Sequence, residues 1–309
     1  MRTEPARELA RGKWAGLLGK WLDERAIAGK HGPCPMCKGG TDRFRFDDKD
    51  GAGTWICSHC GAGDGLHLLQ ALMGCEFPEA AQYVEQHAGK VIAREVKAQR
   101  SEEDIREALR AVWTAGKPLE PGDPVMLYLA ARSGITAPPA GVRYHPALPH
   151  VDDDGVRTTH PAMLAQVLGD DRKPVTIHRT WLTADGKKAA IDKPKKMMTP
   201  TRKMGNVAVR LAPVADGWLG VAEGIETALA AARRHSVPVW ACCTAGLLIT
   251  FRPPPDVKLL AIYGDNDRSF TGQSAAYELA RAVTNIGVEC RVIIPEEQGA
   301  DWADSTEGA

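Results

Sequence analysis

Hydrophobic residues recur along this chain with a helical period in its first part and with a strand period later. Residues 8–27 carry apolar side chains at helical spacing, which predicts a leading amphipathic helix. Residues 66–88 show the same period, and Ser101 with Asp104 provides a start signal for a further helix. From His160 onward the apolar runs shorten to strand length, which predicts a change to β structure.

The last hundred residues alternate between strand and helix patterns. Strands are predicted at 218–222, 237–242, 258–263 and 288–294, with helices at 225–235 and 273–286. This alternation predicts a mostly parallel sheet with helices on both faces. Functional groups gather at the carboxyl ends of such strands, and Glu223, Asp265 and Asp267 each follow a predicted strand closely.

The composition is that of an ordinary globular protein. The 309 residues are 44% hydrophobic and 25% charged, with 39 Lys and Arg against 39 Asp and Glu. These values exclude a wholly disordered or fibrous chain and leave no overall charge excess to attract nucleic acid or membrane. No apolar stretch approaches the ~18 residues of a membrane span, and the N-terminus lacks a signal-peptide pattern. We therefore expect a soluble, cytoplasmic protein of two or three domains.

Four of the eight cysteines form two C-x-x-C pairs. Cys34 is paired with Cys37 and Cys57 with Cys60, and 19 residues separate the pairs. This spacing is typical of four thiolates that bind one structural Zn²⁺. The alternative interpretation is a set of two redox dithiols. The other four cysteines lie in apolar surroundings and are expected in the core.

Cationic and aromatic side chains alternate between the cysteine pairs. Arg43 and Arg45 alternate with Phe44 and Phe46, and Trp55 lies on an expected return strand. Such a sheet suits single-stranded nucleic acid, because charges meet phosphates and rings stack on bases. We therefore predict DNA contacts for Arg43, Arg45, Phe46 and Trp55. In the alternative interpretation the phenylalanines form the core of the sheet and the arginines are solvated.

A family resemblance covers this part of the chain, from His31 to Gln70. The segment reads HGPCPMCKGGTDRFRFDDKDGAGTWICSHCGAGDGLHLLQ and resembles the zinc ribbon of phage and plasmid primases of the primase–helicase family. In that family the ribbon helps to select the template site for priming. The segment departs from bacterial replicative primases, whose ligand set usually includes a histidine, because Cys37 stands at the matching position.

The middle of the chain is strongly basic. Between Arg172 and Arg210 there are eleven Lys and Arg against two acids, which gives this part a net charge of +9. A channel for a polyanion beside an acidic site requires such segregation, and a solvated charged surface is the alternative. The residues expected to contact nucleotide or template phosphates are Lys195, Lys196, Arg202, Lys203 and Arg210.

The acidic residues that follow the predicted parallel strands form a candidate metal site. Asp265 and Asp267 are two residues apart, so they lie on one side of the chain and can share a cation. Converging carboxylates repel one another unless a divalent metal neutralises them, and hard oxygen ligands suit Mg²⁺ or Mn²⁺. The chemistry implied is metal-assisted phosphoryl transfer, whereas a lone D-x-D is more often a solvated loop.

The same residues carry a second resemblance. VAEGIETALAA and IYGDNDRSFTGQSAA resemble the two signature motifs of the Toprim domain, found in primases, topoisomerases and some nucleases. The resemblance implies that Glu223 is the catalytic general acid/base and that Asp265 and Asp267 bind the metal. GADWAD resembles a further motif, which adds Asp301 as a metal candidate. Many primases place an aspartate four residues after the glutamate. That position is threonine here, and Glu226, one residue earlier, either replaces the aspartate as a metal ligand or faces away on the helix.

The order of zinc ribbon, basic middle and Toprim motifs is the order found in primases. We therefore expect a DNA primase, a nucleotidyltransferase that binds single-stranded DNA template and joins ribonucleoside triphosphates into a short RNA primer. No Walker A pattern occurs, so we expect the helicase to be a separate chain, as for an accessory primase of a phage, plasmid or integrative element. The alternatives are a non-catalytic recombination mediator, which also combines a zinc module with a Toprim domain, and a Toprim nuclease.

The expected fold class is a multidomain chain of the α+β and α/β types. Its expected parts are a leading amphipathic helix (1–27), a small β zinc-ribbon DNA-binding domain (28–90), a helical linker (91–120), a basic, mixed β-rich N-terminal part of the catalytic core (121–212) and a Toprim domain with a mostly parallel sheet (213–309).

Overall fold

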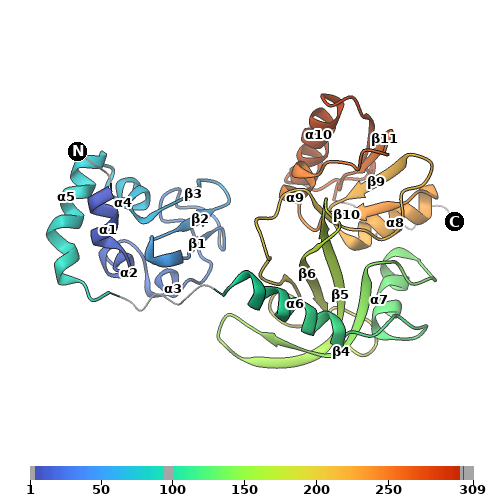
Figure 1. The fold of residues 1–309 in the computed structure, drawn as a ribbon, viewed down its shortest axis with the longest axis horizontal. Coiled ribbons are helices and arrows are strands. Elements are labelled where there is room, and N and C mark those ends of the chain that lie inside the picture. The colour runs from blue at the N-terminus through green and yellow to red at the C-terminus, as the bar shows by residue number, and fades with distance from the viewer. Residues whose placement is uncertain (1–3, 94–99, 300–301, 303–309) are drawn as a thin grey trace. The chain divides into compact units, whose positions relative to one another are not determined.

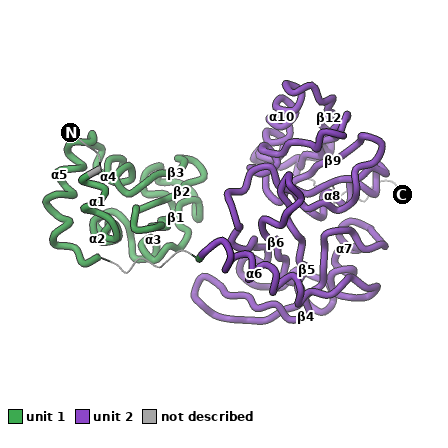
Figure 2. Tube along the Cα trace, in the orientation of Figure 1, with its two compact units in different colours: residues 1–100 green, residues 101–309 purple. Residues whose placement is uncertain are grey.

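The computed structural model describes residues 4–93, 100–299 and 302 of the chain. The chain separates into two compact units, residues 1–100 and residues 101–309 (Figure 2). No helix within these described ranges is long and apolar enough to cross a membrane.

The first unit combines short helices with a small sheet (Figure 1). Its helices are α1 (Glu4–Ala10), α2 (Trp14–Leu17), α3 (Glu24–Ile27), α4 (Gly65–Met73) and α5 (Phe77–His87), with 3₁₀ turns at Lys49–Gly51 and Ala88–Lys90. Its strands are β1 (Phe44–Phe46), β2 (Trp55–Cys57) and β3 (Gly61–Gly63), which pair antiparallel in that order.

The segment predicted as one leading helix, residues 8–27, is divided among α1, α2 and α3. Gly12 adopts a positive φ of 72°, which interrupts a right-handed helix, and the side chain of Asp23 caps the start of α3. The expected apolar face is buried all the same. Trp14 is 1% exposed and packs so closely on Gly65 that a Cβ there would lie 2.2 Å from the indole. The single helix is therefore wrong, although the face assigned to the core is correct.

The second unit contains a large sheet and five helices within the described residues. The helices are α6 (Glu102–Ala115), α7 (Pro124–Ser133), α8 (Ile225–His235), α9 (Ala245–Thr250) and α10 (Thr271–Thr284). The strands are β4 (Val142–Val151), β5 (Arg157–Gly169), β6 (Pro174–Trp181), β7 (Lys195–Met197), β8 (Val207–Val209), β9 (Trp218–Ala222), β10 (Val239–Ala241), β11 (Leu259–Tyr263) and β12 (Glu289–Ile293).

These nine strands form one mixed sheet in the order β12-β11-β9-β10-β8-β5-β6-β7, with β4 paired to β5. The four strands from β12 to β10 are parallel, as the alternating pattern predicts. Strand β8 joins them antiparallel through Ala241 and Val209, and β5, β6 and β7 continue antiparallel. The predicted α+β multidomain fold is confirmed. The basic part and the Toprim-like part share this single sheet, so their polar residues are held on one framework.

Helix α6 packs on this sheet. Ser101 and Asp104 form a reciprocal capping box at its start, as the sequence predicts. Its apolar face contributes Leu109 to a cluster with Ile177 and Trp181 of β6. Part of the segment expected as a linker therefore belongs to the core of the second unit.

Candidate metal and catalytic sites

The two C-x-x-C pairs come together in the first unit. The Sγ atoms of Cys34, Cys37, Cys57 and Cys60 all lie within 4.8 Å of one another, and the Cys34 and Cys60 sulfurs are 3.8 Å apart. A tetrahedral Zn²⁺ with Zn–S bonds of about 2.3 Å has S–S edges of about 3.8 Å. The four thiols therefore fit one zinc ion in both number and spacing.

Backbone N–H groups turn toward these sulfurs, as they do in zinc knuckles. The N–H groups of His59 and Cys60 both point at the Cys57 Sγ, each at 3.4 Å. Hydrogen bonds of this kind orient the ligand and offset the negative charge of four thiolates. Four thiolates complete the tetrahedron, so neither His31 nor His59, which flank the pairs, is needed for this ligand set.

The strand between the pairs has one buried face and one open face. Phe44 and Phe46 of β1 pair in register with Cys57 and Trp55 of β2. Phe46 is 1% exposed and Trp55 3%, so neither ring offers a face to a base. The DNA-stacking role predicted for these two rings is therefore corrected: they form the core of the unit.

The predicted cationic residues of this strand remain at the surface. Arg45 lies in the middle of β1 on the face opposite the rings and is ion-paired with Asp47. Arg43 precedes the strand and folds against the first knuckle, where its side chain occupies the space beside Gly40. Arg43 therefore lies beside the cysteine site, where its side chain also contacts Cys37, whereas Arg45 lies on the open face of β1.

The second unit brings Glu223 and Asp265 to one cavity. Strands β9 and β11 are parallel neighbours with Ala222 opposite Tyr263, so the residues that follow them reach the same edge of the sheet. The cavity there has a volume of about 240 Å³. Its polar lining comprises Arg132, His178, Lys188, Lys195, Glu223, Glu226, Thr227 and Asp265.

The surroundings of Glu223 stabilise its carboxylate charge poorly. Burial raises its pKa; an N–H group of Ala245 and the charge of Lys195 oppose the shift, and the charge of Asp267 adds to it. A glutamate held at such a raised pKa is suited to taking up and releasing a proton.

Asp267 binds the first N–H groups of α10, and its charge acts on Glu223. Its Oδ1 accepts hydrogen bonds from the Ser269 hydroxyl at 2.6 Å and the Thr271 N–H at 3.1 Å, and its Oδ2 accepts from the Gly272 N–H at 2.7 Å. Burial alone would raise the pKa of Asp267, but these hydrogen bonds lower it. Asp267 is therefore an anion, and its hydrogen bonds fix its orientation.

Asp265 faces the cavity and receives a long hydrogen bond of 3.5 Å from the hydroxyl of Thr227. Thr227 occupies the position where many primases have an aspartate, so a hydroxyl replaces a carboxylate there. Within the described ranges, the cysteines are the only group of three or more metal-ligating side chains within 4.8 Å of one another. Two carboxylates still suit Mg²⁺, which keeps several of its waters.

Glu226, another metal candidate, is already paired. It is 5% exposed, and its Oε1 lies 2.8 Å from the Lys195 ammonium and accepts a short hydrogen bond from the Tyr128 hydroxyl. Burial alone would raise its pKa, but Lys195 and Tyr128 lower it to about 2. The remaining candidate, Asp301, lies outside the described residues.

Of the five predicted phosphate contacts, Lys195 is the one that lines this cavity. Arg202 forms a two-pronged ion pair with Asp171, and the Lys196 ammonium donates to a backbone carbonyl at Val151. Arg210 donates to the Gly169 carbonyl and stacks on Trp240. Lys203 is exposed. The basic sequence is therefore partly neutralised by acids that lie outside it.

The sequence analysis does not predict two features of this site. His178 of β6 lines the carboxylate cavity, and burial together with Lys195 lowers its pKa to about 4, so it is neutral at pH 7. The signal for it is the buried polar face that Thr176, His178 and Thr180 form at alternate positions of β6. The other feature is Tyr128, which reaches Glu226 from α7, 98 residues away in sequence.

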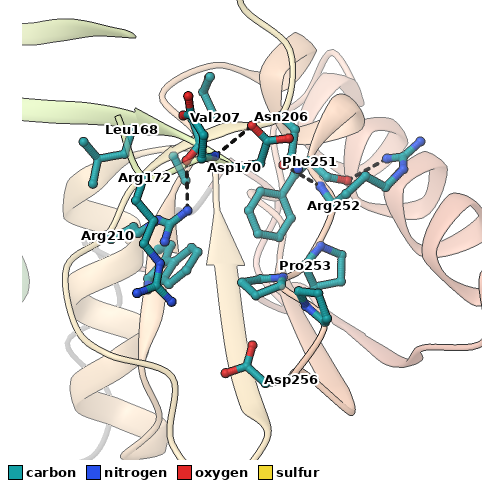
Figure 3. A pocket seen from close by; sticks show the side chains of 16 residues that line it. Leu168, Asp170, Arg172, Asn206, Val207, Arg210, Phe251, Arg252, Pro253 and Asp256 are labelled. Carbon is teal, nitrogen blue, oxygen red and sulfur yellow. Dashed lines mark hydrogen bonds between the residues drawn. The ribbon is translucent and has the colours of Figure 1, made fainter. Parts of the chain in front are cut away.

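A larger cavity, of about 590 Å³, lies away from the carboxylates (Figure 3). Its lining includes the rings of Trp240 and Phe251 and the charged side chains of Arg172, Arg210 and Asp256. It contains none of the predicted acidic or metal-binding residues. The candidate catalytic site is therefore identified by its side chains and not by its size.

Comparisons with known families match three parts of the chain. Residues 29–66 match the zinc-binding domain of primase-helicase. Residues 218–308 match the Toprim domain, and residues 103–211 match a domain of unknown function, DUF7146. Both resemblances expected from the motifs are confirmed: the chain contains a zinc ribbon of the primase-helicase kind and a Toprim domain.

The chain also resembles solved primase structures. It is similar to the zinc-binding and RNA polymerase domains of the Aquifex aeolicus primase, with 14% identity and a TM-score of 0.37 over 96% of this chain and 80% of that one. The primase fragment of the bacteriophage T7 primase-helicase protein is 13% identical, with a TM-score of 0.35 over 88% and 92%. A DnaG primase catalytic domain bound to single-stranded DNA is 17% identical, with a TM-score of 0.35 over 50% and 52%. At these values the likenesses assign no activity to this chain.

Proposed function

We propose that this protein is a DNA primase that synthesises short RNA primers on single-stranded DNA. One observation carries the proposal. Glu223 and Asp265 converge with Lys195 on a cavity at the carboxyl edge of the Toprim strands, in a chain that also has a four-cysteine zinc ribbon. A general base, an anionic metal ligand and a fixed cation are the groups that nucleotidyl transfer requires.

The residues of the cavity have distinct roles in the proposed reaction. Asp265 and Asp267 would hold Mg²⁺ or Mn²⁺. When bound, the metal makes the attacking 3′-hydroxyl more acidic and stabilises the departing pyrophosphate. Glu223 accepts the proton of the 3′-hydroxyl while the 3′-oxygen forms a bond to the α-phosphorus. The bond from the α-phosphorus to the pyrophosphate oxygen breaks in the same step. Lys195 offers a positive charge to the phosphates.

The remaining parts of the protein serve the template. The zinc ribbon would hold single-stranded DNA through Arg43, beside the first knuckle, and Arg45, on the open face of β1. A helicase would act as a separate chain, in keeping with an accessory primase of a phage, plasmid or integrative element.

The proposal is tested by incubating the protein with single-stranded DNA of mixed sequence, labelled ribonucleotides and Mg²⁺ or Mn²⁺. We expect short labelled RNAs from the parent protein and none from Asp265→Ala/Asp267→Ala. DNA binding without any product would favour a recombination mediator, and cleavage of the DNA would favour a Toprim nuclease.

The ribbon arginines give a separate prediction. Replacing Arg43 and Arg45 by alanine should weaken binding of single-stranded DNA about tenfold and reduce the salt dependence of binding, because phosphate contacts release counterions. Fluorescence anisotropy at several salt concentrations measures both effects. Arg25→Ala, which removes an exposed arginine of α3, is the control. Unchanged affinity in the double variant would exclude the ribbon strand as the DNA-binding surface.

A further inference from the structure

Glu226 occupies an unusual place for a carboxylate in a metal site. It is the second residue of α8 and is almost fully buried. One of its oxygens, Oε1, interacts with both the Lys195 ammonium and the Tyr128 hydroxyl. A carboxylate this buried needs such partners, because an uncompensated charge away from water is costly.

The two partners come from a different part of the chain. Tyr128 lies on α7 and Lys195 on β7, both within the region that matches a domain of unknown function. Glu226 lies within the Toprim match. The contact therefore joins the two regions next to the catalytic cavity.

The two side chains of this ion pair differ in their exposure to solvent. The Glu226 side chain is 7% exposed, whereas that of Lys195 is 36% exposed. Lys195 lines the cavity together with Glu223 and Asp265, and its charge acts on Glu223. Glu226 thus supports the ammonium from the protein side, and the open side of Lys195 faces the cavity.

In this arrangement the Glu226 carboxylate is a poor metal ligand. The negative charge of Glu226 is already balanced by a cation at 2.8 Å, and a divalent ion at the same carboxylate would face direct repulsion from Lys195. The Lys195 ammonium therefore already neutralises this carboxylate. A triphosphate, in contrast, is attracted by a cation held in position, because little side-chain freedom is lost when it binds.

We propose that Glu226 is a positioning residue, which with Tyr128 fixes the Lys195 ammonium at the cavity as a permanent cation for the triphosphate of the incoming ribonucleotide, and that Glu226 binds no metal. The inference rests on the proposed primase function for the identity of the ligand. It assigns Glu226 a role that differs from the metal ligation expected from its position after Glu223.

Two binding measurements on the full, zinc-loaded chain test it. Fluorescently labelled ATP with Mn²⁺ reports the nucleotide affinity, and electron paramagnetic resonance of free Mn²⁺ reports metal binding without nucleotide. Glu226→Gln and Lys195→Ala should each weaken ATP binding about tenfold, and the double variant should be no weaker than either, because both changes remove one shared interaction. Mn²⁺ affinity should stay within about twofold of the parent for Glu226→Gln.

The chain offers a matched control in an exposed pair. Lys187 and Asp185 are also 2.8 Å apart, but the Lys187 side chain is 80% exposed, so Lys187→Ala should leave ATP binding unchanged. Tyr128→Phe keeps both charges and removes one hydrogen bond, so it should weaken ATP binding about threefold. If Glu226→Gln does not fold, Tyr128→Phe serves as the test in its place. ATP affinity equal to that of the parent in Tyr128→Phe would then overturn the inference.

Other outcomes are equally decisive. If Glu226→Gln weakens Mn²⁺ binding as much as Asp265→Ala does, Glu226 is a metal ligand and the inference fails. Independent, additive losses from Glu226→Gln and Lys195→Ala would also overturn it. Neither measurement uses primer synthesis. A protein that makes primers but shows parental ATP binding in Glu226→Gln refutes only this inference, and a protein that makes no primers but shows the shared loss refutes only the proposed function.

Discussion

Glu223→Gln is expected to reduce primer synthesis by about 10²–10⁴-fold, the usual contribution of a positioned general base. Glutamine keeps the shape of the side chain but cannot accept the proton of the 3′-hydroxyl. Since Asp265 and Asp267, the proposed metal ligands, are untouched, Mn²⁺ binding should persist. Labelled primer formation at saturating ribonucleotide measures the loss. Glu278→Gln, which alters an exposed glutamate of α10, should leave the rate unchanged.

The raised pKa of Glu223 adds a pH dependence to this prediction. The carboxylate is the active form, so the parent rate should rise as the pH increases through the pKa of Glu223 and then level off. Because burial shifts this pKa upward, the rise should begin above the range of an ordinary glutamate. A rate that is flat across this range would argue against Glu223 as the base.

The same shift predicts an effect on stability with the opposite sign to the loss of activity. Because the pKa of Glu223 is higher in the folded than in the unfolded state, the protonated carboxyl favours folding. This contribution to the free energy of unfolding is complete at low pH and is lost as the pH rises through the folded-state pKa. At pH 7 the buried charge is therefore a cost. In metal-free buffer, Glu223→Gln should melt at a higher temperature than the parent, and the difference should shrink toward acidic pH. A lower melting temperature would show that Glu223 is structural.

The parts of the site that could be predicted from sequence depend on short-range patterns. Glu223 and Asp265 follow apolar strands, and the carboxyl ends of neighbouring parallel strands must meet at one edge. The zinc site is likewise predicted from the spacing of the cysteines, without any knowledge of contacts between distant segments. For these residues the local pattern determines which side chains converge.

The parts that could not be predicted depend on contacts between distant segments. The pairing of Glu226 with Lys195 requires β7 to pass beside the start of α8, which no local periodicity encodes. Alternation of Arg and Phe around Phe46 defines two faces but does not say which face is buried. The basic middle appears unbalanced in sequence because the partners of Lys193 and Arg202 are Asp153 and Asp171, which lie outside the basic run.

Replacing Cys57 by serine is expected to abolish zinc binding and to unfold the first unit. Structural zinc sites in small domains contribute about 10–16 kcal/mol at neutral pH, which is comparable to the whole stability of a typical domain, about 5–15 kcal/mol. Cys34 and Cys57 are also part of the buried core of this unit, beside Phe44 and Trp55. Losing the ion therefore removes support from the centre of that core.

The second unit should be unaffected by this change. Its core clusters contain only residues of the second unit among those described, so calorimetry of Cys57→Ser should show the loss or large downward shift of one transition and an unchanged second one. Elemental analysis should fall from one zinc per chain to none, and template-directed priming should be lost. Cys75→Ser, which alters a partly buried cysteine of the same unit outside the cluster, should retain the zinc and both transitions. If the freshly purified parent protein contains no zinc, the four-cysteine zinc site is excluded. Tetrahedral thiolate sites of this kind bind their metal as the domain folds and retain it afterwards.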